Sequence, residues 1–213
     1  VVSEDPDKTL SNKQFPWLSY RDIEIGMCPV RALRVAYTGE LGWELHHPIE
    51  MQNYLLDILL SSGEEFNLKL VGARAQNWLR QEKSYKAFGS DLGRDAGPFE
   101  SNLTRFVDIN KNFLGKDALL KRKTDVSCIT LLIDGPKDID PWGREALYNE
   151  KEEVMLGRLT SAGYSVHFKR SIGIGYVKSS FSEVGTKLRI KIDDAFWDAE
   201  IVEDSPYDPQ NER

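Results

Sequence analysis

The spacing of apolar and polar residues changes character along the chain. Residues 1–22 are polar and predict irregular structure. Between Ile23 and Ala36, short apolar runs predict two strands around Gly26 and Pro29. Pro29 weakens the first of them as a central strand, because proline cannot donate to a hydrogen-bond ladder.

Two longer segments have helical spacing. Met51, Leu55, Ile58 and Leu59 form one apolar stripe, which predicts a helix from about Pro48 to the Ser61-Ser62-Gly63 stop. A second helix is predicted from about Gly72 to Tyr85. Strands that alternate with helices in this way indicate an α/β or α+β layer.

After a predicted strand at Phe106–Ile109 and a short helix at Lys116–Lys123, short β-rich runs dominate. Many short strands separated by turns indicate a small antiparallel barrel or sandwich. The predicted turns are Gly135-Pro136, Glu150-Lys151, Gly163, Gly185 and Asp193-Asp194. The predicted strands are Val126–Ile133, Arg144–Tyr148, Val154–Ser161, Ser171–Val177, Thr186–Ile192 and Phe196–Val202.

Composition narrows the class of protein. The 213 residues are 40% hydrophobic and 29% charged, which is typical of a globular protein, and the net charge of −6 argues against binding a nucleic-acid backbone. No apolar run approaches the roughly 20 residues that cross a membrane. Cys28 and Cys128 predict two reduced thiols in an intracellular protein, with a single disulfide between them as the alternative. The start at Val1, without an initiator methionine, predicts a piece of a longer polypeptide.

The segment Arg34–Leu45 holds the main candidate site. It predicts a strand, a bend at Gly39 and Gly42, and a second strand that carries Glu44 inward. Tyr37 and Glu44 flank the bend. A glutamate there could accept two parallel hydrogen bonds from an aminopyrimidinone ring such as a pterin, and a tyrosine could stack on that ring. The alternative is an ordinary hairpin with a solvated acid.

The phrase Tyr37-Thr38-Gly39-Glu40-Leu41-Gly42-Trp43-Glu44 resembles the signature of the glycine-cleavage T-protein (aminomethyltransferase) family. The longer run through Pro48 is most similar to the folate-binding part of dimethylglycine and sarcosine dehydrogenases. The resemblance implies an α+β protein: the latter part of a folate-binding α/β domain (1–110), a linker helix (111–124) and a C-terminal β-barrel with its tail (125–213). Other phrases that resemble the family are Gly97–Leu103, Phe113–Leu119, Ser161–Ser165 and Gly173–Tyr176.

The same resemblance implies the site residues. In the family, the tyrosine and the last glutamate of the motif contact the pterin of tetrahydrofolate, which assigns that role to Tyr37 and Glu44. Arg80, in a family-like Leu-Arg-x-Glu segment, either lines the folate pocket or forms a structural ion pair or a solvated face. The glycine-cleavage enzymes often carry an arginine four residues earlier, where this chain has Gln76. That departure counts against a complete aminomethyltransferase site.

No catalytic residue is predicted within the chain. The family's aspartate that engages the folate nitrogen belongs to an earlier half of the module, which we expect upstream, and no motif gives that task to Asp91 or Asp95. His46 and His47 are adjacent and point to opposite faces of a strand, so they are poor ligands for one metal ion, and we predict no metal site.

The implied function is the C-terminal portion of a tetrahydrofolate-dependent one-carbon transferase module. In such proteins an upstream FAD domain oxidises an N-methyl amine to an iminium, whose carbon the folate accepts, so the expected partners are tetrahydrofolate, that iminium and the missing N-terminal half. No nucleic-acid or membrane partner is expected. The expected compartment is the cytoplasm, or the mitochondrial matrix in a eukaryote. The alternatives are a regulatory or binding module of the same fold without turnover, and a fragment of a free-standing glycine-cleavage aminomethyltransferase.

Overall fold

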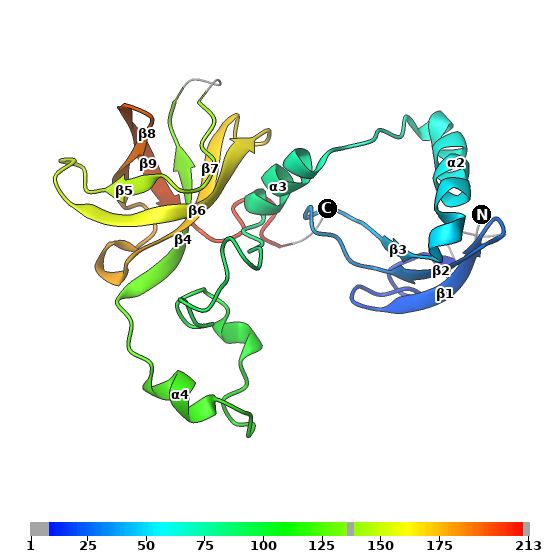
Figure 1. The fold of residues 1–213 in the computed structure, drawn as a ribbon, viewed down its shortest axis with the longest axis horizontal. Helices are drawn as coiled ribbons and strands as arrows, with labels where there is room; N and C mark the ends of the chain where they lie inside the picture. The colour runs from blue at the N-terminus through cyan, green and yellow to red at the C-terminus, as the bar shows by residue number, and fades with distance from the viewer. Residues whose placement is uncertain (1–8, 136–138, 211–213) are drawn as a thin grey trace. The chain divides into compact units, whose positions relative to one another are not determined.

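A computed structural model describes residues 9–135 and 139–210. The chain divides into two units, one up to Gln76 and one from Asn77 onward, and each is described by itself. The first unit combines a small sheet with a helix, and the second contains a β-barrel (Figure 1).

The sheet of the first unit is antiparallel in the order β1 (Tyr20–Ile25), β2 (Cys28–Leu33), β3 (Glu44–His46). The β1–β2 turn begins at Gly26, whose φ of +61° suits a residue without a Cβ. Pro29 lies in β2, the central strand. It is tolerated there because β3 pairs only with Arg31–Leu33, so β2 has no strand partner on that side at Pro29.

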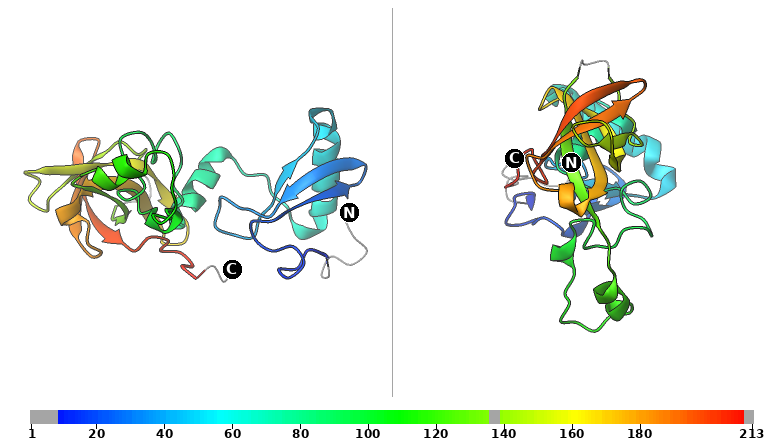
Figure 2. Two further views of the ribbon diagram at one scale, coloured as in Figure 1. Left: turned by 90° about the horizontal axis from the view of Figure 1, so that it is seen from below. Right: turned by 90° about the vertical axis from the view of Figure 1, so that its left-hand side faces the viewer.

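The predicted first helix is confirmed. A 3₁₀ turn, η1 (Ile49–Met51), leads into α2 (Gln52–Gly63), which is followed by the short η2 (Glu64–Phe66). Figures 1 and 2 show α2 along one face of the sheet. Its apolar stripe packs on the buried β2 side chains Cys28, Val30 and Ala32. The preceding stretch also contributes to this core, because Phe15 is fully buried, although the sequence predicted only polar irregular structure there.

The helix α3 (Ala73–Glu82) confirms the second predicted helix, and α4 (Lys116–Lys121) the third. The predicted strand Phe106–Ile109 is wrong. A 3₁₀ turn, η3 (Thr104–Phe106), occupies its start, and a turn from Asp108 to Lys111 follows, closed by a hydrogen bond from Lys111 N to the Asp108 carbonyl at 3.2 Å. The Asp108 carboxylate accepts a hydrogen bond from the backbone N–H of Asn110 at 3.0 Å, a local bond that competes with strand pairing.

All six strands predicted after residue 124 are present, and they close into a barrel in the order β4-β7-β6-β5-β8-β9. Closure leaves no sheet edge exposed to other chains. Its core consists of leucine, isoleucine, valine and alanine side chains from every strand. The α+β fold class is therefore confirmed. The strands are β4 (Val126–Ile133), β5 (Ala146–Tyr148), β6 (Met155–Ser165), β7 (Arg170–Lys178), β8 (Lys187–Ile192) and β9 (Ala195–Val202), with η4 (Ser179–Phe181) after β7.

Gly163 was predicted to mark a turn and instead lies inside β6. A Cβ at this position would fall 2.1 Å from Cδ1 of Trp78 on α3. The glycine is therefore needed so that the indole can pack directly against the strand. The turn between β6 and β7 follows at residues 166–169.

Candidate functional site

The loop that carries the site motif, residues 34–43, connects β2 to β3. Gly39 has a φ of +80°, and a Cβ on Gly42 would fall 2.6 Å from the Cβ of Ala36. The two limbs of the loop therefore touch at Ala36 and Gly42. This confirms that the motif's glycines allow an unusual backbone angle and a close approach.

The predicted strand around Val35 and Tyr37 is wrong, because β2 ends at Leu33. Arg34 redirects the chain. Its backbone N–H donates to Ser19 O at 3.0 Å and its carbonyl accepts from Leu18 N at 3.2 Å, so the backbone pairs with the N-terminal stretch.

The guanidinium of Arg34 fixes the same connection from inside. It is buried and donates to the carbonyl of Phe15 at 2.7 Å, to the carbonyl of Leu10 at 3.3 Å and to the side chain of Asn12. It also lies 5.4 Å from the ring of Trp43, which packs edge-on against Phe15. Sequence reasoning missed this anchor, since its partners are 19 to 24 residues away in the chain.

Glu44 begins β3 and pairs with Leu33. The strand alternates, so Leu45 faces the core with Ala32 while Glu44 and His46 face the open side of the sheet. The expectation that Glu44 points inward is therefore wrong. Its side chain is 55% exposed, and its Oε2 lies 3.4 Å from Nε2 of His46. A carboxylate has about four lone-pair sites, so this contact leaves Glu44 able to accept further hydrogen bonds.

Tyr37 lies on the loop one residue beyond the contact between Ala36 and Gly42, and its side chain is exposed. Glu44 lies two residues beyond the same contact on the other limb. The close approach of the limbs brings the two predicted pterin-binding residues into one region of the first unit. Their role toward a ligand stays a prediction.

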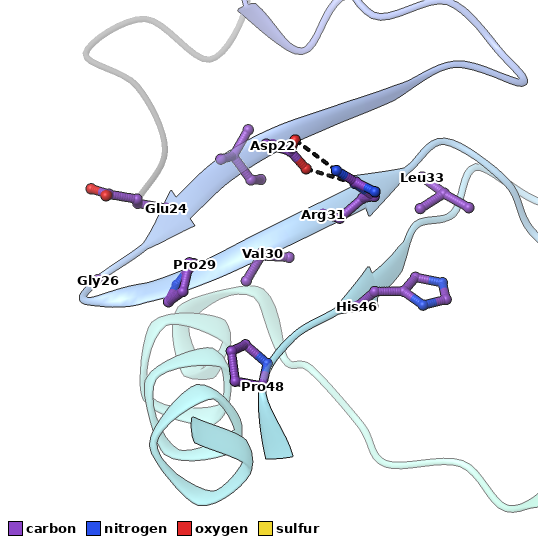
Figure 3. Close-up of a pocket in the computed structure, with 10 residues that line it drawn as sticks. Asp22, Glu24, Gly26, Pro29, Val30, Arg31, Leu33, His46 and Pro48 are labelled. Atoms are coloured by element: carbon purple, nitrogen blue, oxygen red, sulfur yellow. Dashed lines mark hydrogen bonds and ion pairs between the residues drawn. The ribbon is translucent and has the colours of Figure 1, made fainter. Parts of the chain in front are cut away.

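A hollow of about 1020 Å³ lies on the first unit (Figure 3). Glu44 is not part of its lining, but its strand partner Leu33 and its contact His46 are. The lining consists of Asp22, Ile23, Glu24, Gly26, Pro29, Val30, Arg31, Leu33, His46 and Pro48.

A cross-strand ion pair crosses this hollow. Arg31 donates to both carboxylate oxygens of Asp22, at 2.7 and 2.9 Å (Figure 3). This hydrogen-bonded pairing lowers the pKa of Asp22. Both side chains are more than half exposed, so the pair orders the surface more than it stabilises the fold.

Arg80, the third predicted site residue, is buried at the end of α3. It donates to Asp91 Oδ2 and to Ser161 Oγ, both at 2.7 Å, to the carbonyl of Tyr85 at 2.6 Å and to Asn77 Oδ1 at 2.9 Å. Four of the five guanidinium N–H groups are therefore engaged within the second unit. These contacts favour the structural alternative, and a role in a folate pocket stays a prediction.

Asp91 is equally saturated. Its side chain has no exposed surface, and besides Arg80 it accepts from the hydroxyls of Thr160 and Ser161 at 2.5 and 2.6 Å and from Ala87 N at 2.9 Å. All lone pairs of the Asp91 carboxylate are therefore used, and its hydrogen bonds hold the residues after α3 against β6. It has none left for a ligand.

Both cysteines are buried and free. Burial raises the pKa of the Cys128 thiol to about 12, so this thiol stays protonated and unreactive near neutral pH. The described residues contain no group of three or more metal-ligating side chains placed to share an ion. Nor do they include a helix with the length and apolarity to span a bilayer.

Comparison with known proteins agrees with this architecture. The model of the GCVT N-terminal domain matches residues 2–111, and the model of the glycine cleavage T-protein C-terminal barrel domain matches residues 127–208. The chain belongs to the glycine-cleavage T-protein family. This confirms the resemblance that the Tyr37–Glu44 motif indicated.

Similar proteins include a dehydrogenase and an aminomethyltransferase. The chain is 36% identical to human mitochondrial dimethylglycine dehydrogenase, over 96% of the chain and 23% of that protein. It is 29% identical to an aminomethyltransferase of Caldanaerobacter subterraneus subsp. tengcongensis, over 97% of the chain and 55% of that protein. The chain thus spans about a quarter and about half of these relatives. The crystal structure of aminomethyltransferase T from Bartonella henselae shares the fold, with a TM-score of 0.77 and 22% identity over 91% of the chain and 53% of that structure.

Proposed function

We propose that this T-protein-family chain forms part of a tetrahydrofolate-dependent one-carbon transfer module and that Glu44 and Tyr37 hold the pterin. The observation that carries the proposal is the position of Glu44, an anionic side chain on the open face of β3 with acceptor sites to spare. Family membership supports the choice of ligand. The 36% sequence identity to a dimethylglycine dehydrogenase supports the further proposal that this chain belongs to an N-methyl-amine dehydrogenase-like protein with an FAD domain.

The residues present fit one end of a reduced folate. The amino group and ring N–H of a pterin form a pair of parallel donors, and a carboxylate is the acceptor that matches them. The exposed ring of Tyr37 can stack on a flat heterocycle from the adjoining limb. When bound, tetrahydrofolate supplies the nucleophilic nitrogen that accepts the one-carbon unit.

The contribution of this chain is to bind and orient. Arg34 is the one buried charged side chain among the described residues of the first unit, so no buried acid or base is poised there for proton transfer. In the second unit, the saturated Asp91 cannot serve either. Holding the pterin fixed places the distal reacting nitrogen, and such positioning can account for much of the rate of a two-substrate reaction. We place the aspartate that engages that nitrogen outside this chain.

The test is a titration of the complete gene product with tetrahydrofolate. Replacing Glu44 by glutamine keeps the size of the side chain but removes its charge and turns one acceptor into a donor that faces a donor. We expect affinity to fall about ten- to a hundredfold, since a hydrogen bond to a charged group contributes about 1.5–3 kcal/mol. Glu50→Gln, an exposed acid in η1, is the matched control and should bind like the wild type. An unchanged dissociation constant in Glu44→Gln would refute the assignment.

Two other functions make different predictions about the complete gene product. A regulatory module without turnover predicts an upstream half that lacks the folate-engaging aspartate. A free-standing aminomethyltransferase predicts no flavin-binding segment. A dinucleotide-binding GxGxxG motif together with that aspartate favours the dehydrogenase-type module.

A further inference from the structure

His46 is the polar neighbour of Glu44 on the open face of β3. The two residues are separated by one position, so they point to the same side of the strand. Their side chains are 60% and 55% exposed, and Nε2 of His46 lies 3.4 Å from Oε2 of Glu44. His46 also lines the hollow (Figure 3), so the Glu44 carboxylate contacts a residue of the hollow's lining.

The other charged groups on the open face of the sheet either bond to each other or lie away from Glu44. Arg31, the strand partner of His46 on β2, is held by Asp22 of β1 through two hydrogen bonds. Glu24 lies farther along β1, opposite Pro29. Leu33, opposite Glu44, is apolar. Among the described residues, His46 alone makes a hydrogen bond to the Glu44 carboxylate.

The charge of His46 decides what this contact does. A neutral imidazole protonated at Nε2 donates one hydrogen bond to Oε2, which limits the rotation of a flexible side chain and leaves the other acceptor sites open. A protonated imidazole makes a charge-assisted bond, roughly twice as strong as a neutral one. That stronger bond holds the carboxylate against the ring and offsets its negative charge, which weakens the hydrogen bonds that the carboxylate accepts from the N–H donors of a ligand.

We propose that His46 is a positioning residue for Glu44 and makes the binding of reduced folate sensitive to pH. The neutral ring orients the carboxylate toward the ligand, and the protonated ring withdraws it. This inference rests on the proposed function, because it assumes that Glu44 is the pterin acceptor. It goes beyond that function by assigning a second residue and a direction of regulation.

The test measures tetrahydrofolate affinity in the complete gene product between about pH 8 and about pH 5.5, the range in which imidazole changes charge. Wild-type affinity should fall about tenfold more than that of His46→Gln, whose side chain keeps a donor but does not take up a proton. At about pH 8, His46→Leu should bind about three- to tenfold more weakly than wild type, while His46→Gln stays within about twofold. His47→Gln is the control, because His47 contacts the Pro48 carbonyl.

The outcomes separate this inference from the proposed function. If Glu44→Gln weakens binding but His46→Leu does not, or if His46→Gln keeps the wild-type pH dependence, the positioning role is refuted alone. If Glu44→Gln binds like the wild type at every pH, both proposals fail. Circular dichroism of each variant verifies folding, which substitutions at the exposed Glu44 and His46 should not disturb.

Discussion

Removal of the cation from the Arg80–Asp91 pair should destabilise the second unit strongly. The side chains are 3% and 0% exposed, so Arg80→Met leaves a carboxylate in the interior without its counter-charge. Breaking a buried pair from one side costs about 3–5 kcal/mol. For a chain of this size, about 2–4 °C per kcal/mol converts this to a fall of roughly 6–20 °C in the melting temperature.

Thermal unfolding followed by circular dichroism measures this effect. Arg31→Met is the matched control, because it breaks an arginine–aspartate pair whose side chains are 57% and 65% exposed, and it should leave the melting temperature almost unchanged. Equal, small shifts in both variants would refute the buried network. A wild-type melting temperature in Arg80→Met combined with weaker tetrahydrofolate binding would instead establish Arg80 as a pocket residue.

Two further predictions follow from local packing. Gly42→Ala should lower the free energy of unfolding by about 1–3 kcal/mol, because the new methyl group would lie 2.6 Å from Ala36 Cβ. Denaturant titration measures this change. An unfolding midpoint equal to that of the wild type would contradict the contact between the two limbs of the loop. Burial raises the pKa of Cys128 from 9.0 to about 12, so it should resist iodoacetamide at pH 8.5 until the chain is unfolded. The folded state holds the thiol proton more tightly than the unfolded state, so the free energy of unfolding should decline between pH 9.0 and about 12, and should decline less in Cys128→Ala. Mass spectrometry measures the alkylation, and alkaline unfolding measures the pH dependence. Rapid alkylation of the folded protein would refute the burial of this thiol.

The barrel could be predicted from the sequence because its information is local. Short β-rich runs separated by turn residues marked each strand, and the first predicted barrel strand, Val126–Ile133, matches β4 residue for residue. The wrong predictions fall where a local hydrogen bond or a distant packing contact decides the backbone. The Asp108 carboxylate accepts a hydrogen bond from the backbone N–H of Asn110, and Gly163 leaves space for the indole of Trp78, 85 residues earlier in the chain.

The candidate site could be predicted only in part. Its residues came from the resemblance, while the face of the sheet on which Glu44 lies depends on the register of β3 with β2. The course of the preceding loop depends on Arg34 and its partners in the N-terminal stretch. Such long-range contacts leave no periodic signal in the sequence.

The most direct measurement is a crystal structure of the complete gene product with tetrahydrofolate bound. The account predicts two pterin nitrogens within about 2.7–2.9 Å of the Glu44 carboxylate oxygens, with the ring of Tyr37 against the pterin. A pterin bound elsewhere, with Glu44 contacting only solvent and His46, would contradict it.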